Sequence, residues 1–420
     1  MLISLRALLA GAAFLVSSGP VLAESLSLSQ AQQLAARRSQ QLVASDAAAV
    51  AARETAAAAG QLPDPVLRIG VENVPLSGPE RLSLGRDFMT MRRIGLAQEL
   101  TRREKRELRS ERAGREGERV QAERQGSLAE LQRETALAWI ERFYADAMVD
   151  LLRTQLGEAE LQVRGSEVAF RGGRGSQADV FAARAAVVNL HDRLAVAERQ
   201  AANARVMMAR WIGPEAAAQP LAGTVNWGDP GVEQVLVPGH LQHHPQLLVL
   251  AAGVRAAETE LRQAQAATRP DWTVEVMYSQ RGSAYSDMVS VGASVPLQWD
   301  RPSRQNRDIA AKAAMLSEAR ARYEEAVRAE ESMVRQMLNE WSSGRQRLER
   351  LSRELVAEAR HRSDAALAAY RAGKGELATV LTARREEIDA RMQILSLEME
   401  VARAWARLRF LVPDNSLAPN

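Results

Sequence analysis

The feature that most constrains the fold is a long helical pattern that no proline interrupts, at residues 101–171. Apolar side chains recur there at steps of three and four, the spacing of one helix face: Leu137, Ile140, Tyr144, Met148 and Leu151. A helix of about 70 residues is about 105 Å long at 1.5 Å per residue, several times the diameter of a small domain. No compact core can bury it, so it needs a partner along its whole length.

The sequence is also duplicated. Phe170-Arg-Gly-Gly-Arg-Gly-Ser176 matches Tyr370-Arg-Ala-Gly-Lys-Gly-Glu376, 200 positions later. Three more pairs of segments match in the same order at offsets of 197 to 207: 94–100 with 291–297, 63–64 with 270–271, and 211–214 with 410–413. Repeats at one offset indicate two copies of a structural unit. We expect a first repeat at 24–213, a linker at 214–239, a second repeat at 240–413 and a tail at 414–420.

Each repeat changes its hydrophobic period in the same order, from helix to two strands to two helices. Glycines and prolines mark the boundaries, among them Pro63-Asp64-Pro65 and Gly172 to Gly175. The elements expected in the first repeat are helix 28–60, strands 66–72 and 89–98, and helices 101–171 and 177–211. Those of the second are helix 243–268, strands 272–278 and 288–297, helix 303–371, turn 372–375 and helix 376–411. The two shorter helices of the first repeat sum to about 68 residues, so stacked end to end they could cover the long one.

The strands of the second repeat alternate cleanly. Trp272, Val274, Val276 and Tyr278 share one face, whereas strand 89–98 alternates poorly because Arg92 and Arg93 are adjacent. Such alternation is commonest where a strand lies half-buried on a soluble core. An aromatic residue at each end, with no other segment left to form that core, favours a lipid-facing strand. Four strands are too few for a membrane barrel, which needs about eight, so the chain must oligomerise if these strands enter a bilayer.

Charge and composition exclude several classes of function. The formal charge is only +3, and basic and acidic residues are interleaved, as in the run 102–124, so no patch for nucleic acid stands out. This run is expected to form a helix face with many salt bridges. The chain has no cysteine, which excludes disulfides, thiolate nucleophiles and cysteine metal ligands. No catalytic triad, paired-carboxylate or phosphate-loop motif is present, so we expect neither enzymatic activity nor a cofactor.

Residues 1–23 have the pattern of a secretory signal. Arg6 supplies positive charge, residues 7–18 are apolar but too short to span a bilayer, and Val21-Leu22-Ala23 fits a cleavage site. A membrane anchor is the less favoured alternative. We therefore expect an exported protein.

Two groups of residues invite a metal interpretation. His240, His243 and His244 lie at the expected start of a helix, where a capping or solvated role is favoured over metal binding because no set of three or four ligands is visible. Met89, Met91 and Met288 could bind Cu(I), although apolar packing is the commoner use of methionine. No metal site is assigned.

At this point the sequence resembles the outer-membrane factor family, the TolC-like exit ducts of tripartite efflux pumps. The duplicated unit and its two glycine turns carry the resemblance across the whole mature chain. Segments 62–75 and 89–98 resemble the subgroup associated with heavy-metal cation efflux. The resemblance implies a mainly α fold with a small membrane β-barrel. In this fold a homotrimer forms a 12-stranded barrel and a periplasmic helical tunnel, in contact with outer-membrane lipid, a periplasmic adaptor and an inner-membrane RND-type pump.

The resemblance also suggests site residues. Relatives place acidic residues at the tunnel constriction, where this sequence has Thr379 and Thr382, and Asp179 is the one carboxylate at the equivalent place in the first repeat. An alternative role for Asp179 is stabilisation of a helix N-terminus. The turns join the longest helices to their partners, so we expect them at the end far from the strands, as adaptor-docking tips: Gly172, Gly173, Arg174, Gly175, Gly373, Lys374 and Gly375.

Two other functions stay open from the sequence. A periplasmic coiled-coil adaptor would also be exported and helical, but it usually folds one hairpin between split β-domains. A soluble periplasmic metal-binding protein would need a ligand set that is not visible.

Overall fold

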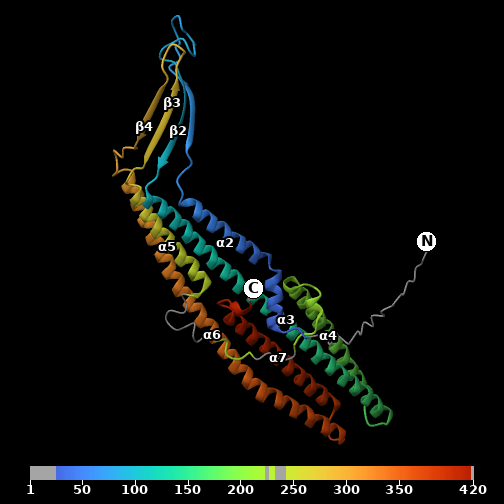
Figure 1. Ribbon diagram of the computed structural model, residues 1–420. Coiled ribbons are helices and arrows are strands. Elements are labelled where there is room, and N and C mark those ends of the chain that lie inside the picture. The colour runs from blue at the N-terminus through green and yellow to red at the C-terminus, as the bar shows by residue number, and fades with distance from the viewer. Residues whose placement is uncertain (1–24, 223–226, 232–242, 418–420) are drawn as a thin grey trace, which may run out of the picture.

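The computed structural model describes residues 25–222, 227–231 and 243–417. The expected signal segment, His240 and much of the linker lie outside these ranges. The molecule is elongated, with a four-stranded sheet at one end and two helical hairpins at the other (Figure 1). Within the described ranges, no helix combines the length and the apolar character needed to cross a membrane.

The order of the elements confirms the duplication. In the first repeat the elements are α1 (Leu28–Arg38), α2 (Gln40–Ala59), β1 (Val66–Glu72), β2 (Met91–Leu100), α3 (Arg103–Arg171) and α4 (Gln177–Ile212). In the second they are α5 (Pro245–Ala266), β3 (Trp272–Gln280), β4 (Met288–Ser294), α6 (Gln305–Arg371) and α7 (Leu377–Arg409). Short 3₁₀ turns lie at Ala216–Ala218 and Asn415–Leu417.

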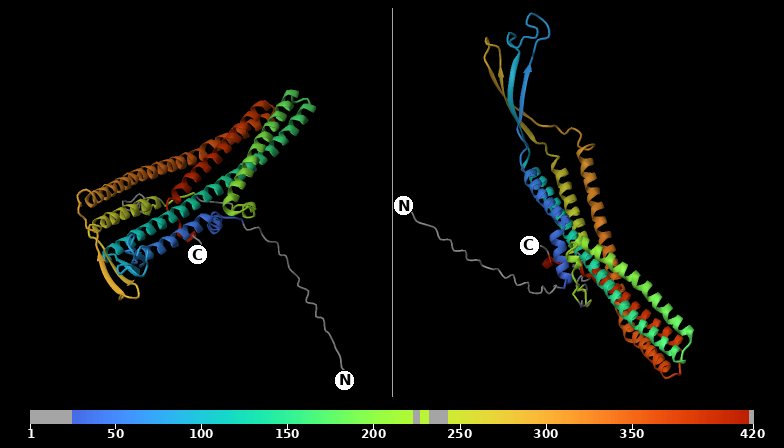
Figure 2. Two further views of the ribbon diagram at one scale, coloured as in Figure 1. Left: turned by 90° about the horizontal axis from the view of Figure 1, so that it is seen from above. Right: turned by 90° about the vertical axis from the view of Figure 1, so that its right-hand side faces the viewer.

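The long helix α3 is the central element of the molecule. Helices α1, α2 and α4 of its own repeat pack along it, which confirms that shorter helices stacked in line cover the long one. Helices α5 and α7 of the second repeat also pack against α3, and α6 is covered by α5 and α7 (Figures 1 and 2). One helix of the first repeat therefore contacts both repeats.

The prediction of a single helix at 28–60 is wrong in one respect, because this segment forms two helices. Ser39 has ψ of 108°, an extended conformation that ends α1. Its side-chain oxygen accepts a hydrogen bond from the backbone N–H of Leu42 at 3.3 Å and so caps α2. A serine can satisfy a free helix N–H in this way, which makes a break possible without glycine or proline.

The main core lies where α1, α3, α4 and α7 meet, near the middle of the molecule. Trp139 is fully buried, stacks on Phe143 with ring centroids 5.1 Å apart, and donates its indole N–H to the Leu26 carbonyl at 3.2 Å. Trp227, which follows the first repeat, donates to the Tyr144 hydroxyl at 2.8 Å. The aromatic residues are few, and they are concentrated where the terminal segments and the linker must be held.

The four strands form one antiparallel sheet in the order β1-β2-β3-β4. Residues directly opposite one another share a face. Ile94 pairs with Tyr278, and Tyr278 with Val289, whereas Arg93 pairs with Ser279, and Ser279 with Met288. The register therefore gives one apolar and one mainly polar face across all four strands.

Candidate functional site

The two glycine turns have the same geometry. Gly173 has φ of +70° and Gly373 has φ of +72°, a conformation open to glycine at no steric cost. In the first turn the Gly173 N–H donates to the Phe170 carbonyl at 3.0 Å and the Arg174 N–H to the Ala169 carbonyl at 2.9 Å. The second turn repeats both bonds, at the same lengths, from Gly373 and Lys374. This pair of bonds is the Schellman motif, with glycine in the left-handed position, so the sequence match reflects a shared backbone.

Both turns lie at the same end of the molecule, opposite the sheet (Figure 1). This confirms the position expected for them at the end far from the strands. Gly172, Arg174 and Lys374 are exposed there. Each tip is thus a short, exposed turn of defined shape that carries a positive side chain.

Asp179 lies in the first turn of α4, directly after the first tip. Its Oδ2 accepts hydrogen bonds from the backbone N–H of Ser176 at 2.9 Å and from the Ser176 hydroxyl at 2.8 Å. The Asp179 N–H in turn donates to Ser176 Oγ at 3.1 Å, which completes a capping box. The helix-terminal role considered from the sequence is therefore present. A selectivity role, which needs the other chains, stays a prediction.

Thr379 and Thr382 lie in the first two turns of α7, and both are exposed in the single chain. The Thr382 hydroxyl donates to the Ala378 carbonyl at 2.9 Å. Thr382 also lines a cavity of about 690 Å³ between α3, α4 and α7, whereas neither Asp179 nor Thr379 lines it. Thr379 and Thr382 are one helical turn apart on α7, whereas Asp179 lies on α4 and shares no cavity lining with them.

Charged residues of α7 that the sequence analysis missed join the two repeats near the tips. Glu387 is 1% exposed and accepts from Arg384 at 2.9 Å and from Arg391 at 2.6 Å. Arg193 of α4 pairs with Asp389 of α7 at 2.6 Å. The three- and four-residue spacing about Glu387 could have indicated its helix pairs. The link from α4 could not be found, because its partner is 196 residues away.

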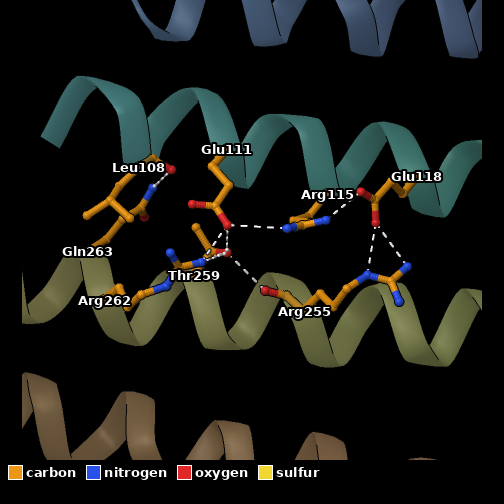
Figure 3. A network of polar contacts seen from close by, with 8 residues as sticks. All are labelled: Leu108, Glu111, Arg115, Glu118, Arg255, Thr259, Arg262 and Gln263. Carbon is orange, nitrogen blue, oxygen red and sulfur yellow. Dashed lines mark hydrogen bonds and ion pairs between the residues drawn. The ribbon is translucent and has the colours of Figure 1, made fainter. Parts of the chain in front are cut away.

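A second polar network joins the repeats closer to the sheet, between α3 and α5 (Figure 3). Glu111 of α3 accepts from Arg262 of α5 at 2.5 Å, and Arg255 of α5 pairs with Glu118 of α3 at 2.9 Å. The Gln263 amide donates to the Leu108 carbonyl at 2.8 Å. The charged run at 102–124 therefore faces a neighbour of the same chain, and the expected salt-bridged face is confirmed.

The pKa of the Glu111 carboxyl reflects this network. The hydrogen bond from Arg262 lowers that pKa most, and burial, the next largest effect, opposes it. The positive charge of Arg262 and hydrogen bonds from Arg115 and Thr259 lower the pKa further. The seam between the repeats at this level is thus held by ionised side chains rather than by a large apolar core.

The faces of the sheet separate the two adjacent arginines of strand 89–98. Arg92 lies at the end of the apolar face, opposite Val71 and Gln280. Arg93 lies on the polar face, where it pairs with Glu72 and donates to the Ser279 hydroxyl at 3.2 Å. Arg68 pairs with Glu275 on the same face at 2.7 Å. The opposite face presents exposed apolar side chains from every strand: Leu67, Ile69, Val71, Ile94, Leu96, Leu100, Trp272, Val276, Tyr278, Val289 and Val291. A sheet with an uncovered apolar face must bury it against something outside this chain.

The histidine cluster differs from expectation in part. His244 does occupy the N-cap position of α5, but its side chain makes no capping bond. It is largely buried, with Nε2 3.3 Å from a Glu330 carboxylate oxygen of α6. Burial lowers the pKa of His244 and raises that of Glu330. The solvated role is wrong for His244, because α6 covers it. Among the described residues, no three His, Cys, Asp or Glu side chains are grouped as metal ligands.

The geometry can now be compared with known proteins. Residues 236–412 match the family model described as outer membrane efflux protein. The second repeat therefore matches the outer membrane efflux protein model, over less than half of the chain. The match covers the second repeat, and the shared order of elements extends the same unit to the first. The search of curated proteins gives no match.

Solved structures of outer-membrane channels share the fold over nearly the whole chain. The outer-membrane channel OprN has a TM-score of 0.74 at 19% identity, over 93% of this chain and 91% of its own. CusC has a TM-score of 0.77 at 16% identity, over 92% of each chain. VceC of Vibrio cholerae has a TM-score of 0.70 at 17% identity, over 90% of this chain and 96% of its own.

The match of the second repeat and the fold shared with outer-membrane channels agree with the resemblance found in the sequence. They favour the efflux channel over the two alternatives from the sequence, the periplasmic adaptor and the soluble metal-binding protein. The uncovered apolar face of the sheet and the exposed glycine tips are two surfaces of this chain whose partners are still to be assigned.

Proposed function

We propose that the protein is the outer-membrane exit duct of a tripartite efflux system, a passive conduit without chemistry of its own. One observation carries this proposal. The chain places a sheet with an uncovered apolar face at one end and two equivalent exposed turns at the other, joined by helices that run the distance between them (Figure 1).

The sheet is the part that enters the outer membrane. Its apolar face suits lipid, and its polar face carries ion pairs such as Arg68 with Glu275. Strands β1 and β4 are edges with unpaired backbone groups on one side. Edges that lie in lipid must be paired, since no water is available to them. Assembly as a homotrimer, in which each edge meets a neighbouring chain, supplies that pairing.

The glycine turns are the docking tips for a periplasmic adaptor, with an inner-membrane RND-type pump behind it. Turn residues 172–175 and 372–375 have one backbone shape in two copies, so a trimer presents six similar sites. Repeated, exposed and conformationally defined turns are suited to recognition by a repeated partner.

Heavy-metal cations are the proposed substrate. The proposal rests on the resemblance of segments 62–75 and 89–98 to the metal-efflux subgroup, and on Asp179 near the tip as a carboxylate that would favour cations.

Three measurements test the proposal: membrane fractionation, cross-linking and single-channel recording. The protein should be recovered from the outer-membrane fraction only with detergent, should cross-link to a trimer, and should give single-channel conductance in planar bilayers. Export is tested separately, by metal accumulation in cells that lack the duct and in cells that are complemented with it. Recovery in the soluble fraction without detergent, or a monomer without conductance, would contradict the proposal.

A further inference from the structure

The apolar row of β4 continues past the end of the strand. Val289 and Val291 are 69% and 74% exposed, and at the same spacing of two the irregular segment that follows contains Leu297 at 62% and Trp299 at 87%. Trp299 is the most exposed large apolar side chain among the described residues. A tryptophan side chain this exposed is typical of a contact surface, and the residues around it indicate what kind of surface it contacts.

The segment around Trp299 is held in place by the helix beneath it. The Gln298 amide donates to the Ala267 carbonyl at 2.9 Å, and the Arg301 guanidinium donates to the Thr268 carbonyl at 2.7 Å. These two bonds flank Trp299 and attach the segment to the C-terminal end of α5. The exposed indole therefore sits at a fixed level, at the junction of sheet and helices.

The length of the row matches the thickness of a membrane. Val289 and Trp299 are ten residues apart, which is at most about 33 Å at about 3.3 Å per residue, because β4 ends at Ser294 and Trp299 lies in a turn. Membrane strands are tilted by about 40°, so the row projects to about 25 Å, the usual height of the apolar band of outer-membrane β proteins. Tyr285 lies just beyond the other end of the row.

Three arginines follow Trp299 within eight residues. Arg301, Arg304 and Arg307 are all exposed, and none of them forms an ion pair within the described part of the chain. Two acidic residues flank this group: Asp300, which accepts the Ser303 N–H at 3.2 Å, and Asp308 in the first turn of α6. An exposed tryptophan followed by arginines without an acidic partner is typical of a membrane–water interface, where the indole lies among headgroups and the guanidinium groups meet phosphates. Arg301 keeps donors for this role besides the one that bonds Thr268.

We propose that segment 297–307 anchors the chain in the periplasmic leaflet of the outer membrane. Leu297 lies at the edge of the acyl chains, Trp299 among the headgroups, and the three arginines bind anionic phospholipid. This inference rests on the proposed function, because it needs the sheet to lie in the membrane. Phospholipid is the favoured occupant because the row continues the apolar face of the sheet and ends in unpaired positive charge.

The absence of cysteine from the chain gives a direct test, since each introduced cysteine carries the only label. Spin labels are placed by Val291→Cys, Leu297→Cys, Trp299→Cys and Ser303→Cys in the full-length protein, in phosphatidylethanolamine–phosphatidylglycerol vesicles. Collisions with oxygen report lipid, and collisions with a water-soluble nickel complex report solvent. We expect labels at 291 and 297 in lipid, about 15 Å apart in depth from six extended residues at the tilt above. We expect 299 at the boundary and 303 in water.

Val291→Cys separates the two proposals. A label at 291 in lipid with labels at 297 and 299 in water overturns the anchor alone, and so do labels at 297 and 299 that neither reagent reaches, since a second copy then covers the segment. A label at 291 in water overturns both proposals. As a second measurement, Trp299→Phe should reduce the quenching of tryptophan fluorescence by brominated phospholipid, and Trp341→Phe on α6 should not. Equal quenching in wild type and Trp299→Phe would also overturn the anchor.

Discussion

Proline at the centre of a tip turn tests both the backbone argument and the docking proposal. Gly173 has φ of +70°, and proline is fixed near −65°, so the turn cannot keep its shape in Gly173→Pro. The change also removes the N–H that donates to the Phe170 carbonyl at 3.0 Å. Gly173→Ala keeps that N–H, and its only cost is the left-handed backbone conformation, about 1–2 kcal/mol for a residue with a Cβ.

The loss should stay local, because the nearest core cluster, around Leu152 on α3, lies about 20 residues from the tip, or about 30 Å at 1.5 Å per residue. The main core around Trp139 lies farther still. We therefore expect Gly173→Pro to assemble as a trimer with nearly unchanged thermal stability, yet to abolish efflux, with Gly173→Ala intermediate. Gly373→Pro should behave in the same way, since its turn has the same bonds.

The assay is substrate accumulation in cells that express each variant, with trimer content measured by cross-linking in the same membranes. Gly157→Ala is the matched control: it lies inside α3 with open space at the new Cβ and should stabilise the helix by about 1 kcal/mol without affecting efflux. Normal efflux by Gly173→Pro would refute the docking assignment. Loss of the trimer would refute the claim that the damage is local.

Four further changes test other parts of the structure. Asp179→Asn keeps an oxygen that can accept the cap bonds but loses the charge. It should weaken cation preference and block by multivalent cations in planar bilayers, with little loss of stability. Lost stability with unchanged conductance would make Asp179 a helix cap only. Glu387→Ala leaves two arginines near a buried site without their carboxylate and should cost about 3–5 kcal/mol in chemical unfolding, and a cost below 1 kcal/mol would contradict this. The Arg142 side chain is 2% exposed and donates to the Gln219 carbonyl at 2.7 Å. Arg142→Ala should lower the free energy of unfolding by about 2–4 kcal/mol and make the linker more sensitive to protease. Unchanged protease resistance would contradict the role of this contact. Because Arg262 lowers the pKa of Glu111, the carboxylate stabilises the folded state at pH values above its ordinary pKa of about 4.5. That contribution disappears as the pH falls through the lower pKa of the folded state. Glu111→Gln should therefore reduce the loss of unfolding free energy at acid pH, and an unchanged loss would contradict this.

The sequence by itself determined the elements whose signals are local. The glycine turns, the proline-free long helices and the strand alternation of the second repeat depend on residues near one another in the chain, so the duplicated unit could be predicted from spacing alone. The position of both tips at one end also followed, because helices of such length leave few other arrangements. Boundaries differed by a few residues, as at β2, expected at 89–98 and found at Met91–Leu100.

Only the tertiary structure decided which residues meet across long separations. The register of β2 against β1 and β3 places Arg93 on the polar face, and strand 89–98 by itself does not reveal this. Glu330 covers His244 from a helix 86 positions away, and α3 of the first repeat receives α5 and α7 of the second. The physical reason is that hydrogen bonds and turns within a few residues are fixed by local chain geometry. Pairing and burial between distant segments depend instead on how whole helix faces and strands pack, which no short window of sequence contains.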